Sequence, residues 1–316
     1  MNVSSALRCT NTGLCFSTAT PFYFSPGRSL LENIPDHHVA VLAPVFAYWI
    51  LSLFFHILDI SGWEWLDAYR LHDSEEVKTK NLATRTEVVW AVLVQQFFQT
   101  ILGYLFVSEP LEVLVPVRDM SQLAETLQPF LQPIPSLHLD NDQLSSLVYV
   151  LYWWAIPVAK FYIAILFLDT WQYFLHRGMH LNKFLYKQFH SWHHRLYVPY
   201  AFGSLYNHPL EGIVLDSLGA IFAESLTGMT PRQAMFLFTI STLKTVDDHC
   251  GYRLPFDPLQ LMTSNNADYH DIHHQVIGIK SNFSQPFFVH WDVILGTRMT
   301  RKDIEQRRRK LEGKKL

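Results

Sequence analysis

The stretch DTWQYFLHRGMHLNKFLYKQFHSWHH, residues 169–194, decides how the rest of the chain is interpreted. It contains two histidine boxes, HRGMH from residue 176 and HSWHH from residue 190, and a third box, HDIHH, begins at residue 270. On a helix, residues three or four positions apart lie on one face, so each box is expected to point its imidazoles one way, as half of a cage. The boxed histidines are His176, His180, His190, His193, His194, His270, His273 and His274.

This number of histidines exceeds what one divalent metal ion uses, which is rarely more than three or four, and it therefore predicts two metal ions. A lone HxxxH is usually accidental or a surface pair. Two HxxHH boxes are harder to explain without metal, because buried histidines are costly and protonated neighbours repel. A zinc protease is excluded, since Arg177 follows His176 where HExxH requires glutamate. Imidazoles without thiolates favour a pair of irons that activate O₂.

The composition indicates a membrane protein. Hydrophobic residues make up 49% and aromatic residues 15% of the 316-residue chain, and they gather in long apolar runs. The mean hydropathy of only +0.07 places much of the chain outside lipid. The cysteines Cys9, Cys15 and Cys250 are odd in number and lack CxxC spacing, so neither a disulfide framework nor a thiolate metal site is expected.

Three apolar runs, residues 39–60, 88–107 and 147–168, are long enough to span a bilayer as helices. The third continues directly into the first histidine box. Residues 61–87 are rich in lysine and arginine, whereas residues 108–143 are acidic, so the positive-inside rule places the former in the cytosol and the latter in the lumen. His138 is thereby excluded from the site. The short apolar runs 212–226 and 235–246 flank a turn and predict a hairpin that enters the bilayer and returns.

The expected fold is therefore an all-α integral membrane protein with three spanning helices, a short membrane hairpin and a cytosolic helical cap that holds a di-metal site. The chain is divided into a poorly ordered lead-in without a signal peptide at residues 1–38 and membrane helices with a lumenal loop at residues 39–146. A catalytic domain is expected at residues 147–300 and a basic cytosolic tail at residues 301–316.

In their order and spacing, the three boxes resemble those of the membrane fatty acid hydroxylase and sterol desaturase superfamily. More closely, LYNHPLEG (205–212), TVDDHCGY (245–252) and NNADYHDIHHQ (265–275) resemble the sphingolipid C4-hydroxylases, or sphinganine C4-monooxygenases, of fungi and plants. The resemblance covers residues 147–297 and implies a non-haem di-iron enzyme of the endoplasmic reticulum membrane. Its reaction would be the O₂-dependent hydroxylation of sphinganine or dihydroceramide at C4, with the boxes and the C-terminus in the cytosol.

The resemblance also implies electrons from cytochrome b5 and its NAD(P)H reductase. The chain has no GxGxxG for NAD or flavin and no haem-binding HPGG, so its electrons must arrive from outside. The basic loops around the boxes offer a docking surface for an acidic partner. The aromatic residues Phe283, Phe287, Phe288 and Trp291 are interpreted as a bilayer-interface cluster near the entrance for the lipid.

Further site residues follow from position and from the resemblance. Related enzymes recruit a histidine between the second and third boxes, which points to His249. His208 is a ligand, a partner of a ligand, or a helix-start histidine beside Pro209. Carboxylates that fix imidazole tautomers, or else cap helices, are Asp169, Asp247, Asp248 and Asp271. Left outside the site are His56, His72 and His290.

Two alternatives stay open at this point. The boxes are shared with sterol C4-methyl oxidases and C5-desaturases of the same superfamily, because hydroxylation and desaturation use the same ligands. A membrane metal-binding or transport protein without catalytic activity is the third possibility, although such proteins usually place histidines within spans or in low-complexity loops.

Overall fold

A computed structural model of the chain describes residues 7–10, 13–27, 29–106, 115–133 and 139–312. The chain forms two compact units, each assembled from separate stretches of sequence. The first comprises Met1–Asp36 and Glu109–Ile163, and the second comprises His37–Ser108 and Ala164–Leu316. The second unit is discontinuous in sequence because the first two long helices pack with the histidine-bearing segment. The domain boundaries predicted at residues 38, 146 and 300 stay a prediction.

The first unit joins a short hairpin to helices. Strand β1 (Leu7–Cys9) pairs antiparallel with β2 (Cys15–Ser17), and the helical elements are α5 (Pro116–Leu131), α6 (Asn141–Val150) and the π-helical turn η2 (Leu151–Ala155). Phe16 and Leu14 pack in one core with Met120, Leu144 and Val148. The segment that was expected to be a poorly ordered lead-in thus contains a hairpin whose Leu14 and Phe16 side chains are buried in the core of the first unit.

A disulfide joins Cys9 to Cys15 in this hairpin. The expectation that no disulfide forms was wrong. Cysteine number and CxxC spacing say nothing about strand register, and the antiparallel register places Cys9 and Cys15 directly opposite each other. Cys250 is free and buried.

Among the residues that the structure describes, three helices are long and apolar enough to cross a membrane, and they coincide with the three predicted spans. They are α1 (Asp36–Ile60), α4 (Arg85–Phe106) and a continuous helix from Asn141 to Leu181. This last helix consists of α6, η2 and α7 (Ile156–Leu181) and is longer than predicted. Pro157 does not break it, because the preceding π-helical turn shifts the hydrogen bond of the Ile156 N–H to the Leu151 carbonyl, one residue further back than in an α-helix.

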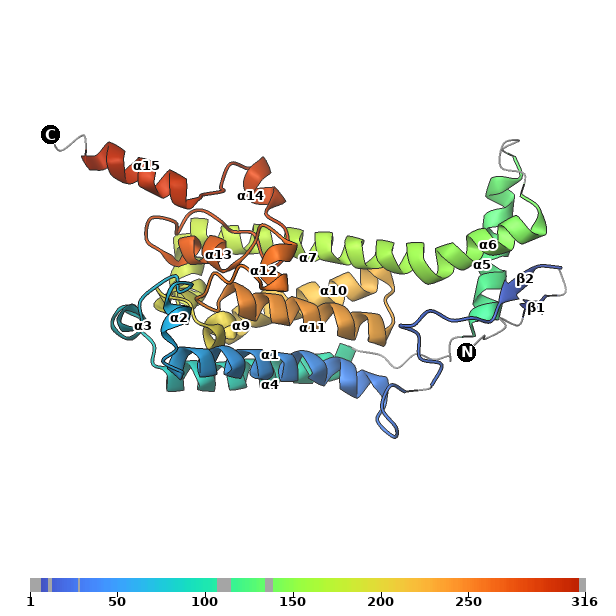
Figure 1. Cartoon of the computed structure of the whole chain (residues 1–316), viewed down its shortest axis with the longest axis horizontal. Helices are drawn as coiled ribbons and strands as arrows, with labels where there is room; N and C mark the ends of the chain where they lie inside the picture. Colours follow the sequence, from blue (N-terminus) through green and yellow to red (C-terminus); the bar gives the residue numbers. More distant parts are fainter. Residues whose placement is uncertain (1–6, 11–12, 28, 107–114, 134–138, 313–316) are drawn as a thin grey trace. The chain divides into compact units, whose positions relative to one another are not determined.

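In the second unit α1 and α4 lie side by side (Figure 1). Trp49 Nε1 donates to Gln96 Oε1 at 2.8 Å. Gly103 has no side chain, so its backbone packs directly against Val41 and the two helices can approach each other closely. Large apolar side chains on both helices are exposed, including Phe46, Ile50, Phe54, Trp90, Phe97 and Ile101. Such faces suit a lipid environment, where apolar side chains need no cover.

A helical hairpin occupies the predicted position between the second and third boxes. Its first arm consists of α9 (Pro209–Gly212), the π-helical turn η6 (Ile213–Ser217) and α10 (Leu218–Thr227), and its second arm is α11 (Pro231–Asp248). The turn depends on Gly228, whose φ of +58° places it in the left-handed region. Thr230 and Gln233 then form a capping box that starts α11.

The remaining elements of this unit are short. Between the first two spans lie α2 (Glu64–Asp67) and α3 (Ser74–Lys80). After α7 follow α8 (Lys183–Leu185), η3 (Tyr186–His190), η4 (His193–Arg195), η5 (Ala201–Leu205), α12 (Pro258–Met262), α13 (Ala267–His274), α14 (His290–Ile294) and α15 (Arg301–Glu312). The core of the second unit brings together residues of the long helices and of the loops that are far apart in sequence, such as Tyr48, Phe55, Tyr206, Val246 and Tyr252.

Candidate metal centre

Nine histidine side chains converge in two groups. The first group holds His176, His180, His190, His194 and His273, and the second holds His193, His249, His270 and His274. Within each group the candidate ligand nitrogens all lie within 4.8 Å of one another. The groups adjoin, since the ring centroids of His194 and His274 are 4.8 Å apart.

From its spacing, each HxxHH box was expected to contribute to one group. Instead, each of the two boxes is divided between the two groups. In the second box, His190 and His194 turn into the first group, whereas His193 turns into the second. In the third box the division is reversed, because His270 and His274 lie in the second group and His273 in the first. Within each box, the two histidines four positions apart lie on one face and enter the same group. The histidine three positions after the first lies near the end of a short helical turn and enters the other group. Each box therefore contributes to both groups.

Backbone carbonyls set the tautomer of five rings. Nδ1 of His176, His249 and His274 donates at 2.8 Å to the carbonyls of Phe283, Thr245 and Leu196. Nδ1 of His273 donates to Ser281 at 2.7 Å, and Nδ1 of His193 donates to Tyr206 at 3.3 Å. A carbonyl oxygen only accepts, so the proton of each neutral ring is on Nδ1 and the lone pair on Nε2 faces the group.

These lone pairs make the centre suited to a cation. Nε2 of His193 and Nε2 of His249 are 3.3 Å apart, although both rings have already committed their only proton elsewhere. In the described part of the chain, the buried Nε2 of His273 has no hydrogen-bond partner. Facing lone pairs repel unless a positive ion lies between them, so the donor set fits metal ions.

Burial supports the same conclusion for the rings outside the spanning helices. Burial, followed by the charges of neighbouring imidazoles, holds the pKa of each of these rings well below its ordinary value, which keeps it neutral at pH 7. The rings concerned are His190, His193, His194, His270, His273 and His274. Neutral imidazole is the form that binds metal.

Comparison with known proteins decides the family. The fatty acid hydroxylase family matches residues 161–297, a range that includes all nine histidines. A sphingolipid C4-hydroxylase of Saccharomyces cerevisiae is 44% identical over 94% of this chain and 85% of its own length. A sphinganine C4-monooxygenase of Arabidopsis thaliana is 44% identical over 84% of this chain and 88% of its own.

The chain belongs to the sphingolipid C4-hydroxylase family. A protein of Oryza sativa named as a very-long-chain aldehyde decarbonylase is also 42% identical, over 84% of this chain and 90% of its own. No solved structure matches the chain.

In this C4-hydroxylase family member, Glu211 is a site residue that the sequence analysis did not single out. Its Oε1 lies 2.5 Å from Nδ1 of His190, and only 4% of the residue is exposed. A carboxylate on the far nitrogen of a ligand orients the ring and raises its basicity. Glu211 lies in LYNHPLEG, a segment that supported the family resemblance, but nothing in its spacing marked this glutamate as a site residue.

The carboxylates that were expected to fix imidazole tautomers have other partners. Asp169 accepts from the N–H groups of Phe287 and Phe288 at 3.1 and 2.8 Å. Asp271 accepts a hydrogen bond from Gln275 and forms an ion pair with Arg301. Its Oδ1 lies 2.7 Å from Nε2 of His72. In the part of the chain that the structure describes, neither carboxylate reaches a grouped imidazole, so both tie loops together instead.

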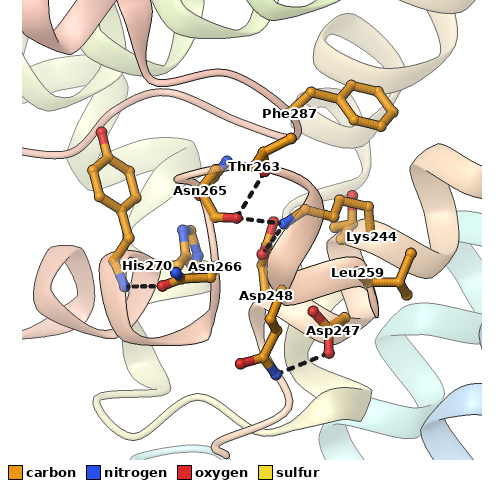
Figure 2. A network of polar contacts seen from close by, with 12 residues as sticks. Lys244, Asp247, Asp248, Leu259, Thr263, Asn265, Asn266, His270 and Phe287 are labelled. Atoms are coloured by element: carbon orange, nitrogen blue, oxygen red, sulfur yellow. Dashed lines mark hydrogen bonds and ion pairs between the residues drawn. The ribbon is translucent and has the colours of Figure 1, made fainter. Parts of the chain in front are cut away.

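The side chains of Asp248 and Asp247 likewise belong to a network of polar contacts near Lys244 (Figure 2). Lys244 is fully buried, pairs with Asp248 and donates to the Asn265 carbonyl at 2.8 Å. Gln260 Nε2 donates to Asp247 at 3.1 Å. These contacts join the C-terminal end of α11, which His249 directly follows, to the segment that leads into α13, the helix that carries His270. Removing one member of a buried pair is strongly destabilising, so the network holds the second group in place.

The other histidines that the structure describes lie apart from the two groups. His208 caps α9 by accepting from the Leu210 N–H at 3.2 Å, as a helix-start histidine does. His72, which the sequence analysis left aside, bridges Glu76 and Asp271. His56 contacts Arg85, and His290 lies beside Trp291. His138 is outside the described residues.

Two of the four aromatic residues that were expected at a bilayer interface lie inside the protein. Phe283 and Phe287 are buried, and the ring of Phe283 lies 5.3 Å from that of His180 and 5.8 Å from that of His273. Trp291 donates to Thr170 at 2.9 Å. Phe283 therefore covers the side of the first histidine group that His180 and His273 form.

A cavity of about 160 Å³ opens beside the histidines and is lined by members of both groups. His176 and His190 of the first group and His193 and His249 of the second face it. Its other walls are partly apolar, from Leu168, Leu215 and Phe238, and partly polar, from Gln99, Gln172, Glu211 and Asp216.

Proposed function

We propose that this protein is a membrane di-iron monooxygenase that hydroxylates a sphingoid long-chain base at C4. The observation that carries the proposal is the pair of histidine groups, with five and four converging imidazoles, in a member of the sphingolipid C4-hydroxylase family. Metal storage or transport needs neither a cavity that touches both groups nor such a family membership.

The first group, with His176, His180, His190, His194 and His273, would hold one iron, and the second, with His193, His249, His270 and His274, would hold the other. Imidazole ligands without thiolates suit iron, and this many are more than a pair of zinc ions requires. Bound irons would supply the oxidising chemistry that inserts one atom of O₂ into an unactivated C–H bond, which no side-chain acid or base can break.

The chain's own contribution is to position groups and exclude water. Carbonyl acceptors and Glu211 hold the rings in the ligating tautomer. Phe283 covers the centre, and the partly apolar cavity admits a lipid chain beside both groups. The two electrons for each turnover would come from cytochrome b5 and its NAD(P)H reductase, docked on the basic residues around the boxes, Arg177, Lys183, Lys187 and Arg195.

The proposed location is the endoplasmic reticulum membrane, with the histidine groups and the C-terminus in the cytosol and the α10–α11 hairpin dipping into the bilayer. Loop charges support this orientation. The Cys9–Cys15 disulfide supports a lumenal first unit, since disulfides persist in oxidising compartments.

Turnover of sphinganine under ¹⁸O₂ tests the proposal. Purified iron-loaded protein with a reductant should yield the C4 alcohol with one ¹⁸O atom, and a His176→Ala, His249→Ala double variant should yield none. An unsaturated base would indicate a desaturase. With a very-long-chain aldehyde as substrate instead, a hydrocarbon product one carbon shorter would indicate the activity for which the rice relative is named. In cells that lack the protein, loss of phytoceramides supports the proposal, whereas accumulation of methylated or unsaturated sterol precursors points to sterol oxidation.

A further inference from the structure

The polar wall of the cavity is centred on the carboxylate of Asp216. Asp216 lies on η6, the π-helical turn within the first arm of the hairpin, and faces the cavity that also touches both histidine groups. Gln172 Nε2 is 3.4 Å from its Oδ1. Gln99 and Gln95 approach its Oδ2 at 3.3 and 3.5 Å. The carboxylate is thus surrounded by amide donors at long distances, which stabilise it weakly.

Within the described ranges, no lysine, arginine or histidine forms an ion pair with Asp216. Taking a carboxylate out of bulk water is costly unless a cation or strong donors replace the lost hydration. Three glutamine amides at 3.3–3.5 Å replace it only in part. A cationic ligand in the cavity would complete its coordination.

Glu211 gives a second, independent indication of a ligand. Its Oε1 is engaged by His190, but Oε2 is buried and has no hydrogen-bond partner in the described residues. Only 4% of the residue is exposed, and it lines the same cavity as Asp216. Because the turn between them is π-helical, residues five apart return to the same face. The two carboxylates therefore stand about one helical turn apart, roughly 5 Å along the axis.

We propose that Asp216, together with the unpaired oxygen of Glu211, binds the ammonium group of a free long-chain base. This inference rests on the proposed function and names its preferred substrate. In such a base the amino nitrogen and C4 are separated by three single bonds, about 4 Å. An ammonium held between the two carboxylates would leave C4 beside His190, whose Nδ1 contacts Glu211. The apolar side chains Leu168, Leu215 and Phe238 line the path of the hydrocarbon tail.

The charge requirement separates free bases from ceramides. Acylation turns the ammonium into a neutral amide, which cannot form an ion pair with Asp216. The protein should therefore prefer sphinganine to its N-acylated forms, and the preference should depend on the charge at residue 216.

The test compares sphinganine with N-acetylsphinganine for the wild type, Asp216→Asn and Asp216→Glu. Asp216→Asn keeps the shape and removes the charge. It should raise KM for sphinganine about 10- to 100-fold with little change in kcat, as expected for the loss of one charge-assisted contact. It should raise KM for N-acetylsphinganine much less, because the neutral amide has no ion pair to lose. Asp216→Glu should retain most of the preference. Glu224→Gln is the matched control, because it makes the same chemical change on α10 outside the cavity lining.

Equal effects of Asp216→Asn on both substrates, or no effect on either, would overturn the headgroup assignment. Binding of both compounds to chelator-treated protein provides a readout that needs no iron, and equal affinity of the wild type for the two would overturn it as well. This measurement needs no variant, so poor folding of a variant leaves the test intact. Failure of the wild type to hydroxylate either compound contradicts the proposed function, whereas hydroxylation without a charge preference contradicts only the role of Asp216.

Discussion

At the scale of single residues, the candidate metal centre is organised by the hydrogen-bond acceptor behind each imidazole. Spacing within the boxes identified eight of its histidines, and the resemblance added His249. The groups that hold the rings were not predictable from spacing, because most are backbone carbonyls from distant segments, such as Phe283 behind His176 and Leu196 behind His274. Every residue has a backbone carbonyl, so the sequence does not show which carbonyls accept these hydrogen bonds. The carboxylates chosen for this role, Asp169 and Asp271, proved to bind loops.

Glu211 is the exception that substitution can test. Glu211→Ala removes the acceptor on Nδ1 of His190 and should lower iron affinity and turnover about 10- to 100-fold, because partners behind a ligand orient it and raise its basicity. Glu211→Gln should have an intermediate effect, since its amide oxygen still accepts. Iron titration followed by turnover measures both, with Glu224→Ala as control. Iron binding as tight in Glu211→Ala as in the wild type would remove Glu211 from the centre.

At the scale of elements, the helices were more predictable than the turns between them. Hydropathy located α1 and α4 within a few residues. The division of each HxxHH box between two groups was not expected, because it depends on where α13 and the short turns η3 and η4 end. The segment after α13 supplies the carbonyls of Ser281 and Phe283, and buried Asp292 holds it by accepting from the N–H groups of Phe283 and Ser284.

Close packing of this segment gives a prediction about glycine. A Cβ on Gly278 would lie 1.8 Å from the Ile272 carbonyl oxygen, so Gly278→Ala must displace backbone beside the third box. We expect a loss of about 1–3 kcal/mol of unfolding free energy together with weaker iron binding. Gly178→Ala is the control: it lies between His176 and His180 on α7, and a Cβ there meets nothing within 4 Å.

Gly178→Ala should be neutral or stabilise the protein by up to about 1 kcal/mol, as alanine does in a helix. Denaturant unfolding in detergent compares the two variants. The packing argument is wrong if both variants unfold at the wild-type midpoint.

At the scale of the whole molecule, apolar length and composition were enough to predict three spans, and loop charges predicted an orientation. The Cys9–Cys15 disulfide was not predictable, because it depends on the register of the β1–β2 hairpin. No hydrophobic periodicity in the sequence indicates this hairpin. The catalytic domain predicted at residues 147–300 stays a prediction. In the structure, α1 and α4 from outside it belong to the same compact unit as the histidines.

The orientation can be tested in sealed microsomes. An epitope at the C-terminus should be removed by added protease, and one inserted near residue 20 should be protected, since the proposal places the basic tail in the cytosol and the first unit in the lumen. Detergent should expose both epitopes to the protease. Protection of the C-terminal epitope would place the histidine groups on the wrong side for a cytosolic electron donor.

If two groups of neutral imidazoles hold two irons, the metal content of the purified protein will show it. We expect about two irons for each chain, and loss of iron on replacing His193 and His270 of the second group, with the second unit still folded. Zinc in place of iron, or a single metal ion bound equally well without those two histidines, would contradict it.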